Sequence, residues 1–402
     1  MDFTSVILGT DINAYGVARS LHEAYGVCSH AYGVKPLRFT RASKIVDVEV
    51  HEDFDTDEGF LRTMKEVAER FQDQKPLLLT SCSDGYTALI AKHKKALEED
   101  FVFNYIDYDL QQKLENKIDF YEICEEYGLD YPATKIISME TKDDLDLGFT
   151  FPVGLKANDS IEFVHMHFEG KKKFYKIDDA EELKRVVDLI YDAGYSGELI
   201  VQDFIPGNSS AMFVLNAYVD SSGEVTMMSL GKCLLDECLP YEIGNYNALL
   251  TIGDDALYDQ YTRFLKALGY RGFANFDLKY DVRDKKYKVF EINIRQGRSS
   301  YYMTAGGCNF MRYPVEDLIE NKSLAPHYHD ERGLWLFVDP SVLRKYGSPE
   351  DKELIDTYLK KGFKFTQWYE KDRSLPRYLD YMRRRISTRK YYPQYEPARQ
   401  ND

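Results

Sequence analysis

The sequence predicts an α/β protein in which an open parallel sheet is followed by antiparallel strands. The first observation is an apolar run at residues 3–9 that leads into a polar turn and a helical pattern, the order that opens a parallel α/β unit. The second is the return of apolar strand patterns at residues 44–48 and 76–80. The third is a pair of strand patterns within residues 272–293, joined by the short turn of a hairpin.

Length and composition indicate a large globular protein with an acidic body. The chain has 402 residues, of which 44% are hydrophobic, enough for two or three domains. Its net charge of −15 argues against nucleic acid as a partner, although a local phosphate site needs only lysines, backbone amides and a metal. The six cysteines are scattered, which is typical of reduced thiols. Because neither a signal peptide nor a membrane span is predicted, we expect a cytoplasmic protein.

Two polar turns, at residues 11–16 and 81–86, follow strands of the predicted parallel sheet. Open α/β sheets bind ligands at the carboxyl ends of their strands. The residues of these segments that are candidates for contact with an amino acid or peptide substrate are Asp11, Asn13, Arg19, Ser83 and Asp84. Helix capping by Asp, Asn and Ser is the alternative interpretation of the same turns.

The middle of the chain alternates between helix and strand patterns. A helical segment spans residues 110–128 and is expected to end at Gly128. Two strands joined by a loop are expected within residues 150–176, the second beginning at Phe163. The remaining segments are a helix at 178–193, a strand at 198–201, strands within 211–235 and a helix at 256–268.

The hairpin places acidic side chains on one face. Side chains alternate along a strand, so Glu291 and Asn293 share a face, and the turn brings Asp277 opposite them. Grouped oxygens in a half-buried site destabilise the fold unless a cation neutralises them, and hard oxygen ligands suit Mg²⁺ that also binds phosphate. The pattern predicts a magnesium site, and a solvated polar face is the alternative.

Two arginines and two hydroxyls come directly after these carboxylates, as Arg295, Arg298, Ser299 and Ser300. Cationic donors of this kind surround a transferring phosphoryl group or an acyl phosphate. We therefore predict catalytic roles for both arginines and contact between Arg298, the two serines and a carboxylate substrate. Pairing of the arginines with neighbouring acids is the alternative.

Two lysines upstream are candidates for a nucleotide site. Lys156 lies within an apolar strand, where burial requires an anionic partner, and Lys117 begins a helix. The alternative is that each lysine extends to the surface. We expect a lid over the phosphates to include Asn158, Ser160 and the lysine-rich segment 170–173, for which a solvated strand tip is the alternative.

The strand exit at residues 199–207 is a candidate adenine site. Backbone groups at such a position can read the adenine edge, with Asp203 or Asn208 available to the ribose. An ordinary strand exit explains the same pattern equally well.

In order and spacing, these segments resemble the ATP-grasp superfamily across residues 110–310. The resemblance rests on Lys117, Lys156, the VQDFIPG strand exit, Asp277 and the EINIRQG segment. It implies that Lys117 binds the phosphates of ATP and acts in catalysis by neutralising the charge that develops during phosphoryl transfer. It also implies that Lys156 lies between phosphate and adenine and that Arg295 contacts phosphate or the acyl phosphate. The residues that it places around adenine are Gln202, Phe204 and Ile205. The ligands that it implies for two Mg²⁺ ions, which Mn²⁺ can replace, are Asp277, Glu291 and Asn293.

A closer resemblance covers nearly the whole chain. The segments ILGTDINAYGVARSLHEAYG, GFANFDLKYD, FEINIRQGRSS and WYEKDRS are similar to the D-aspartate ligase family of peptidoglycan synthesis. In that family the β-carboxylate of D-aspartate becomes an acyl phosphate, which the ε-amine of the stem-peptide lysine attacks. The resemblance implies ATP, an amino acid (D-aspartate) and a peptidoglycan stem-peptide precursor as partners.

The resemblance also implies an ATP-grasp fold in four segments. These are a Rossmann-like parallel-sheet domain at 1–108, a linking helix with a small lid subdomain at 109–200, an antiparallel catalytic subdomain at 201–330 and an extension at 331–402. The extension ends in a tail rich in Arg, Lys and Tyr. We consider two interpretations of this tail, peripheral contact with an anionic membrane at its inner face and a solvated basic helix.

Three functional hypotheses remain open from the sequence. They are a D-aspartate ligase, a ligase of the same chemistry for another amino acid or amine acceptor, and a nucleotide-binding protein without turnover. Retention of Asp277, Glu291 and Asn293 favours the two ligases, because a lapsed site need not keep its metal ligands. The oligomeric state is not determined by any of these patterns.

Overall fold

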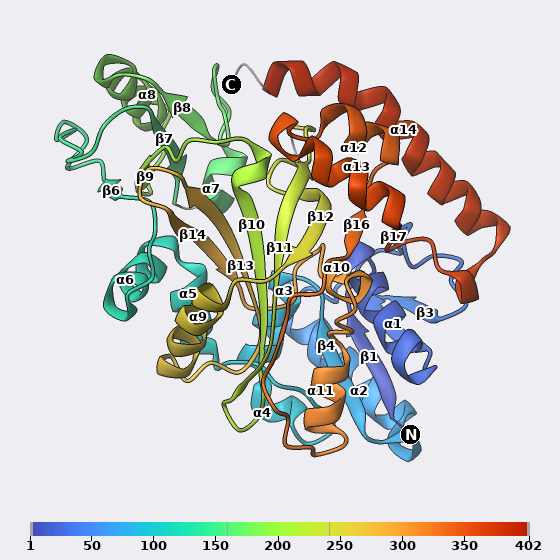
Figure 1. Cartoon of the computed structure of the whole chain (residues 1–402). Helices are drawn as coiled ribbons and strands as arrows, with labels where there is room; N and C mark the ends of the chain where they lie inside the picture. Colours follow the sequence, from blue (N-terminus) through green and yellow to red (C-terminus); the bar gives the residue numbers. More distant parts are fainter. Residues whose placement is uncertain (1–2, 159, 241, 400–402) are drawn as a thin grey trace.

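An open five-stranded parallel sheet forms the N-terminal part of the computed structural model (Figure 1), which describes residues 3–158, 160–240 and 242–399. The strand order is β3-β2-β1-β4-β5, and every pair is parallel, as predicted. The strands are β1 (Thr4–Leu8), β2 (Ser29–Gly33), β3 (Val46–Val50), β4 (Leu77–Ser81) and β5 (Phe101–Val102). The helices are α1 (Ile12–Tyr25), α2 (Asp57–Arg70), α3 (Asp84–Lys92) and α4 (Lys94–Leu97).

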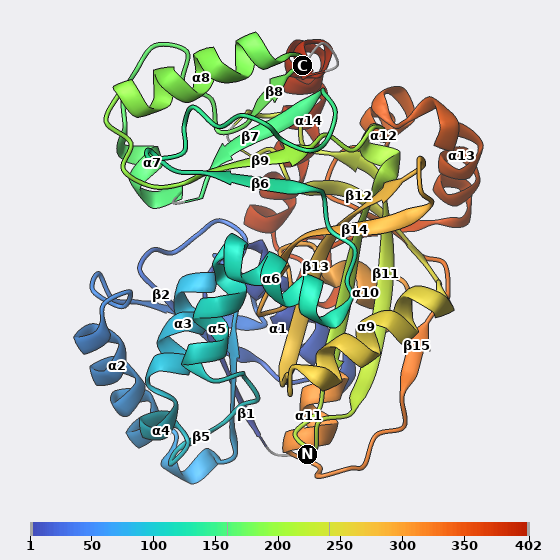
Figure 2. The ribbon, with the colours of Figure 1, turned by 90° about the vertical axis from the view of Figure 1, so that its left-hand side faces the viewer.

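A smaller antiparallel sheet, order β6-β9-β7-β8, forms a lid that lies apart from the N-terminal sheet (Figure 2). Its elements are β6 (Thr134–Ile137), β7 (Val153–Ala157), α7 (Ser160–His165), β8 (Tyr175–Ile177), α8 (Ala180–Asp192) and β9 (Leu199–Asp203). The expected helix at 110–128 is two helices, α5 (Tyr108–Glu115) and α6 (Lys117–Tyr127). Asn116 separates them, because its side chain caps α6 by accepting from the amides of Ile118 and Asp119.

The prediction of a strand beginning at Phe163 is wrong. This residue lies in the short helix α7, and only Tyr175–Ile177 of the expected strand pairs with β7. Phe163 is buried, and its ring packs edge-on against Phe168 and Tyr195, at centroid distances of 6.0 and 5.7 Å. Ring packing therefore buries the Phe163 side chain while its backbone is helical and not paired with a neighbouring strand.

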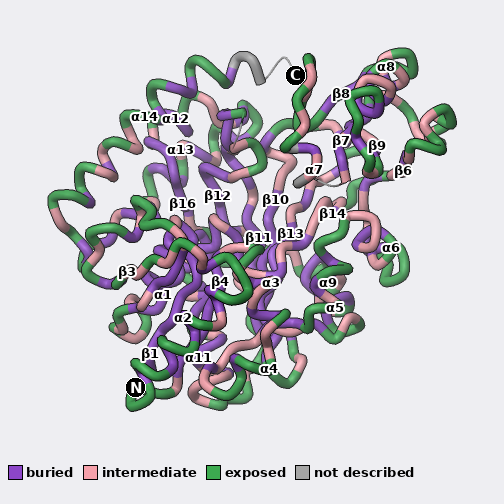
Figure 3. The backbone as a smooth tube through the Cα atoms, turned by 180° about the vertical axis from the view of Figure 1, so that it is seen from behind, coloured by how far each residue is buried: buried purple, intermediate pink, exposed green. Residues whose placement is uncertain are grey.

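An eight-stranded sheet occupies the centre of the molecule, in the order β14-β13-β10-β11-β12-β16-β17, with β15 also paired to β11. Its strands are β10 (Met212–Val219), β11 (Val225–Asp236), β12 (Tyr246–Ile252), β13 (Gly272–Asp281), β14 (Lys286–Asn293), β15 (His327–His329), β16 (Leu334–Leu336) and β17 (Phe363–Phe365). The predicted hairpin is β13–β14, and β14 is the edge strand of the sheet, where its Val289 amide donates to Asp130 O at 2.9 Å. The middle strands β10, β11 and β12 are buried along nearly their whole length (Figure 3).

Helices cover the central sheet and fasten it to the N-terminal part. They are α9 (Asp255–Ala267), α10 (Tyr301–Ala305), α11 (Arg312–Leu318), α12 (Pro340–Tyr346), α13 (Lys352–Lys361) and α14 (Leu375–Arg399). One hydrophobic core includes residues of α1, α10, α11 and β16, among them Tyr15, Tyr301 and Trp335. The N-terminal and central sheets therefore share a core, which fixes the polar turns of one against the hairpin of the other.

The basic C-terminal tail is the long helix α14, and several of its arginines face the protein. Arg385 and Arg389 pair with Asp339 at 2.7 and 2.8 Å, and Arg377 lies 3.0 Å from Asp372. These ion pairs neutralise part of the positive charge of the tail. None of the helices in the described residues combines the length and apolarity that a membrane span requires. The six cysteines, which all lie in the described residues, form no disulfide, and Cys28 alone among them is exposed.

Candidate functional site

Two carboxylates face each other on the hairpin, as the sequence predicts. Asp277 on β13 is paired in register with Glu291 on β14, and both side chains are half-buried. The Tyr246 hydroxyl donates a hydrogen bond to Asp277 Oδ1 at 2.7 Å. Burial raises the pKa of Asp277 to about 7, and the neighbouring Glu291 carboxylate adds to the rise. Two acidic groups held this close gain stability from any cation that binds between them.

Two lysines lie beside this pair. Lys117, the first residue of α6, has its Nζ 3.4 Å from Glu291 Oε2. Lys156 on β7 is mostly desolvated, and this burial lowers its pKa to about 7; the charge of Lys117 lowers it further, whereas Glu291 opposes the shift. Burial would raise the pKa of Glu291, but the two lysines outweigh it and the net shift is downward. The depressed pKa of Lys156 shows that its positive charge lacks full compensation.

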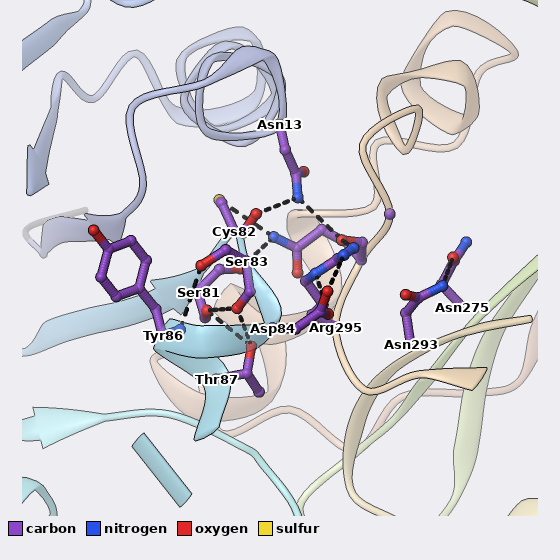
Figure 4. Close-up of polar contacts among 12 residues, drawn as sticks. Asn13, Ser81, Cys82, Ser83, Asp84, Tyr86, Thr87, Asn275, Asn293 and Arg295 are labelled. Carbon is purple, nitrogen blue, oxygen red and sulfur yellow. Dashed lines mark hydrogen bonds and ion pairs between the residues drawn. The ribbon is translucent and has the colours of Figure 1, made fainter. Parts of the chain in front are cut away.

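A chain of side-chain amides orients Asn293, the third predicted metal ligand. Its Nδ2 donates to Asn275 Oδ1 at 3.0 Å, and Asn275 Nδ2 donates to Asn216 Oδ1 at 3.1 Å. Asn216 Nδ2 donates to the Tyr302 hydroxyl at 3.3 Å, whose single proton is donated to Ser229 O at 2.6 Å. Because every donor in this chain points the same way, the amide nitrogen of Asn293 is engaged, and its oxygen accepts no hydrogen bond from the residues that the structure describes. Asn275 and Asn293 lie together in Figure 4.

Arg295 joins the hairpin to the N-terminal sheet. Its Nε lies 2.8 Å from Asp84 Oδ1, and its Nη2 donates to Asp84 Oδ2 at 3.0 Å (Figure 4). Asp84 is exposed at the start of α3. The structure therefore unites two predicted site residues that are far apart in the sequence, and it also realises the alternative interpretation that Arg295 pairs with an acid.

Arg298 is desolvated but weakly paired. Its guanidinium lies over the Phe337 ring, 4.6 Å from the centroid, and the nearest acid, Glu242, is 3.7 Å away. Burial lowers the pKa of Arg298, and the positive charge of Arg384 adds to this effect. Ser299 and Arg298 line one cavity together, whereas the Ser300 hydroxyl turns inward and donates to Gly297 O at 2.5 Å.

The polar turns of the N-terminal sheet are largely occupied by contacts within the protein. Asp11 Oδ1 accepts from the Ala14 amide at 3.0 Å, and Ser83 Oγ accepts from the Tyr86 amide at 3.3 Å, so each caps a helix. Asn13 Nδ2 donates to the carbonyls of Cys82 and Gln296, each at 3.1 Å (Figure 4).

Arg19 is buried among C-terminal residues and lines none of the cavities described below. Its guanidinium lies between the rings of Tyr301 and Tyr369, at 4.4 and 4.7 Å from their centroids. Its remaining partners are the Glu23 carboxylate and the carbonyls of Phe365, Thr366 and Trp368. The contacts with Tyr369 and with the three carbonyls fasten α1 to the C-terminal extension.

The predicted adenine segment runs along β9, beside the strand that carries Lys156. Gln202 donates to Thr134 Oγ1 at 2.9 Å, Ile205 is buried, and its carbonyl accepts from Lys279 Nζ at 2.7 Å. The Phe204 ring has the ammonium groups of Lys176 and Lys279 at 5.5 and 5.3 Å from its centroid. This segment therefore offers an aromatic face with two cations close to it.

Four further predicted nucleotide contacts have different surroundings. Asp203 pairs with Arg283 at the hairpin turn, and Asn208 donates to Ser348 Oγ and Glu350 at 3.2 and 3.1 Å, facing the C-terminal extension. The backbone N–H of Asn158 donates to Glu198 O at 2.9 Å at the end of β7. Ser160 begins α7, and its side chain lies outside the described residues.

Two cavities meet at the end of β14. One of about 600 Å³ is bounded by α3, α5, α6 and the lid, and its charged residues are Asp84, Glu115, Lys117, Lys173 and Glu291. The other, of about 220 Å³, has as its charged residues Asp277, Glu291, Arg295 and Arg298. Glu291 and Asn293 line both cavities. Ligands in the two spaces would therefore meet at the predicted metal ligands.

Sequence reasoning did not identify several residues of this site. Asn275 could have been found, because it alternates with Asp277 on β13 and lies opposite Asn293. Tyr246 and Phe337 gave no signal, because they reach the site only through the pairing of β12 and β16 with the rest of the sheet.

Comparison with known proteins places the chain in a family. No family model matches the sequence. The chain is 45% identical over 391 residues to the D-aspartate ligase of Enterococcus faecium (strain Aus0004), covering 94% of this chain and 93% of that protein. The chain belongs to the D-aspartate ligase family. It is therefore an ATP-dependent ligase that forms a carbon–nitrogen bond, which confirms the expected family and class of enzyme.

Solved structures with little sequence identity share the fold and confirm the expected ATP-grasp architecture. The L-amino acid ligase of Bacillus licheniformis is 16% identical with a TM-score of 0.56, covering 79% of this chain and 74% of that one. N5-carboxyaminoimidazole ribonucleotide synthetase of Thermus thermophilus is 14% identical with a TM-score of 0.61, covering 84% of each chain. The biotin carboxylase domain of Hydrogenobacter thermophilus 2-oxoglutarate carboxylase, solved with MgADP, is 14% identical with a TM-score of 0.60, covering 83% of this chain and 73% of that one.

Proposed function

We propose that this ligase joins D-aspartate, through its β-carboxylate, to the ε-amine of the lysine in a peptidoglycan stem-peptide precursor, releasing ADP and phosphate. The observation that carries the chemistry is the Asp277–Glu291 carboxylate pair, bordered by Lys117 and Lys156 and followed by two arginines. The choice of D-aspartate rests on the 45% identity to a D-aspartate ligase over most of both chains.

The donor set of the hairpin fits Mg²⁺. Asp277, Glu291 and the free oxygen of Asn293 are hard ligands, and the mutual repulsion of the carboxylates favours a cation. No group of three or more His, Cys, Asp or Glu side chains suited to a metal occurs in the described part of the chain, so phosphate oxygens and water must complete the coordination. We infer that these residues hold two Mg²⁺ ions, replaceable by Mn²⁺. The metal would supply charge neutralisation between phosphate oxygens.

The remaining side chains supply binding and orientation. In the predicted adenine segment, Gln202, Phe204 and Ile205 would contact adenine. Lys117 and Lys156 would neutralise the phosphates of ATP. Lys156 is suited to this role because a phosphate would compensate a desolvated ammonium.

The smaller cavity is the proposed site of the donor amino acid. Arg298 and Ser299 line it and would bind carboxylate oxygens, and Arg295 would stabilise the negative charge of the phosphoryl group. Attack of the β-carboxylate on the γ-phosphorus of ATP gives an acyl phosphate and ADP. The amine then attacks the acyl carbon, phosphate leaves, and the attacking nitrogen loses one proton.

The experiment that tests this function uses hydroxylamine as a small substitute for the amine. With ATP, Mg²⁺, D-aspartate and hydroxylamine, we expect β-hydroxamate and phosphate to form in equal amounts. The rate with L-aspartate should be lower by about 10-fold or more, since the wrong stereochemistry misplaces the carboxylate. Absence of phosphate release with every amino acid would contradict ligase chemistry, whereas release with L-aspartate alone would contradict the D-aspartate assignment.

The cytoplasmic location and peripheral contact with an anionic membrane at its inner face stay predictions. The outward face of α14 retains exposed Leu375, Leu379 and Ile386 beside exposed Arg383 and Lys390. Sedimentation with anionic and neutral vesicles tests this surface, and equal recovery with both would argue against it.

A further inference from the structure

A small cavity lies where the N-terminal and C-terminal parts of the chain meet, outside the site described above. It has a volume of about 80 Å³ and is bounded by the loop between β2 and β3, the segment after β17, and α14. We call it the seam pocket, and its lining residues are Arg38, Phe39, Gln367, Arg377, Asp380, Tyr381 and Arg384. Three of these seven are arginines and one is an acid, so the pocket has a net positive lining that favours a negatively charged group.

Two of the three arginines of the pocket already have acidic partners, and Arg384 lies 3.3 Å from the buried Glu237 carboxylate. Arg377 pairs with Asp372 at 3.0 Å and also donates to Phe39 O, so its role is mainly structural. Arg38 is different, because its side chain is about half exposed and its nearest acid, Asp380, is 3.9 Å away. That separation exceeds a hydrogen bond, so the Arg38 guanidinium keeps donors for a ligand.

A buried acceptor completes the pocket. Gln367 is 7% exposed, and among the described residues its Oε1 has no hydrogen-bond partner. An acceptor buried without a partner destabilises the fold, and a ligand N–H would satisfy it. At about 30 Å³ per water molecule, the volume accommodates a group of only a few atoms. A carboxylate next to an amide N–H, as at the end of a peptide, has both the size and the polarity that these groups require.

The seam pocket shares a wall with the proposed donor site. Arg384 of the seam pocket lies 4.2 Å from the centroid of the Phe337 ring, and Arg298 of the donor cavity lies 4.6 Å from the same centroid. A ligand in the seam pocket is therefore separated from the donor cavity by one aromatic ring and its two guanidinium groups. This short separation matches a substrate that binds at one end and reacts at the other.

We propose that the seam pocket binds a carboxylate of the amine-bearing substrate and so selects a peptide with a free carboxyl end as acceptor. The inference rests on the proposed function, since it presupposes an amine that attacks an acyl phosphate. Arg38 would bind the carboxylate oxygens, and Gln367 Oε1 would accept from the adjacent peptide N–H. The second substrate would then approach along the seam between the loop after β2 and α14.

The test compares two acceptors and two variants of the full-length protein. The acceptors are N-acetyl-lysyl-alanine with a free carboxylate and the same peptide as its C-terminal amide. The variants are Arg38→Gln and, as a matched control, Arg383→Gln, which removes an exposed arginine of α14 outside the pocket. Hydroxamate formation is measured in each protein as the reference rate.

For the wild-type protein we expect the KM of the amide peptide to exceed that of the carboxylate peptide by about 10-fold, as one lost charge-assisted hydrogen bond gives. Arg38→Gln should abolish this difference by raising the KM of the carboxylate peptide alone, with kcat changed less than about twofold. Arg383→Gln should retain the wild-type preference. Equal KM values for both peptides in the wild-type protein, or the same change in both variants, would overturn the proposal.

Hydroxamate formation separates this inference from the proposed function. If no hydroxamate forms, the ligase chemistry fails, and the seam pocket loses its basis with it. If hydroxamate forms but neither peptide reacts, the peptide acceptor and the seam pocket are both contradicted while activation of the amino acid stands.

Discussion

The hairpin and the N-terminal turns carry similar polar residues, but their side chains are used differently. On the hairpin, Asp277 and Glu291 face each other, and the side-chain amides of Asn293 and its neighbours leave one oxygen free. On the turns, Asp11 and Ser83 are helix caps. The difference teaches that a polar residue at the end of a strand indicates a ligand site only where its hydrogen-bonding groups lack partners within the protein.

The largest expected effect is on the hairpin. Asp277→Asn should lower kcat/KM about 100- to 1,000-fold, because it removes a charge that holds the metal and phosphates. It should also raise the thermal midpoint at pH 8. The pKa of Asp277 is about 7 in the fold and 3.8 ordinarily, so its destabilising effect is fully present above pH 7 and disappears as the pH falls towards 4.

Steady-state kinetics measures the change in kcat/KM, and calorimetry across this pH range measures the change in thermal midpoint. Asp284→Asn, at the exposed hairpin turn, is the matched control and should keep its activity. A normal turnover number for Asp277→Asn at saturating Mg²⁺ would contradict the role of the hairpin.

Arg19, on the helix that follows the first turn, is expected to respond in the opposite way. Arg19→Met should lower the free energy of unfolding by about 3 kcal/mol or more, because it removes the donor shared by three carbonyls and leaves Glu23 with the Tyr301 hydroxyl. The KM values for ATP and the amino acid should change less than about twofold. Chemical denaturation and kinetics at about 20 °C, where the variant remains folded, measure both. A tenfold rise in the KM of the amino acid would restore Arg19 as a substrate residue.

A smaller effect is expected from Asn275 of β13, which holds the side-chain amide of Asn293 on β14. Asn275→Ala removes the acceptor that holds the Asn293 nitrogen, so the Asn293 amide can rotate. The Mg²⁺ concentration for half-maximal activity should rise about 10-fold. Asn309→Ala, which loses an amide that donates to Ser20 O outside the hairpin, is the control. An unchanged Mg²⁺ requirement would show that the amide chain does not position the ligand.

The smallest effect concerns the lysine that faces the hairpin from the lid. Lys156→Met should stabilise the protein without nucleotide, on the order of 1 kcal/mol at pH 7, because it removes a desolvated charge. The pKa of Lys156 is about 7 in the fold and 10.5 ordinarily. Its destabilising effect is complete below pH 7 and declines as the pH rises to 10.5, so the difference between variant and wild type should narrow over that range. Thermal unfolding at several pH values measures this, and a constant difference would contradict it.

Much of the hairpin was predictable because its information is local. Strand alternation and a short turn suffice to place Asp277 opposite Glu291, and the register confirms this pairing. The same reasoning could not decide the roles of Asp11 and Ser83, because a helix cap and a ligand contact use the same residue types. The strand expected from Phe163 was wrong, since ring packing within the lid overrides the local pattern.

Contacts between distant segments could not be predicted from spacing. The pairing of Arg295 with Asp84 joins residues 211 positions apart in the sequence, and the meeting of Arg298 and Arg384 on the Phe337 ring needs α14 to fold back over the sheet. The order of the ATP-grasp segments was available only through resemblance.

The most direct test of the account measures the affinity of a non-hydrolysable ATP analogue with and without Mg²⁺. Titration calorimetry on the wild-type protein and on the double variant Asp277→Asn, Glu291→Gln gives the ratio of the two affinities for each protein. We predict that Mg²⁺ strengthens binding to the wild-type protein about 10-fold or more and has no such effect on the double variant, whose binding without the metal is retained. The same enhancement by Mg²⁺ in both proteins would contradict the claim that the hairpin carboxylates hold the metal.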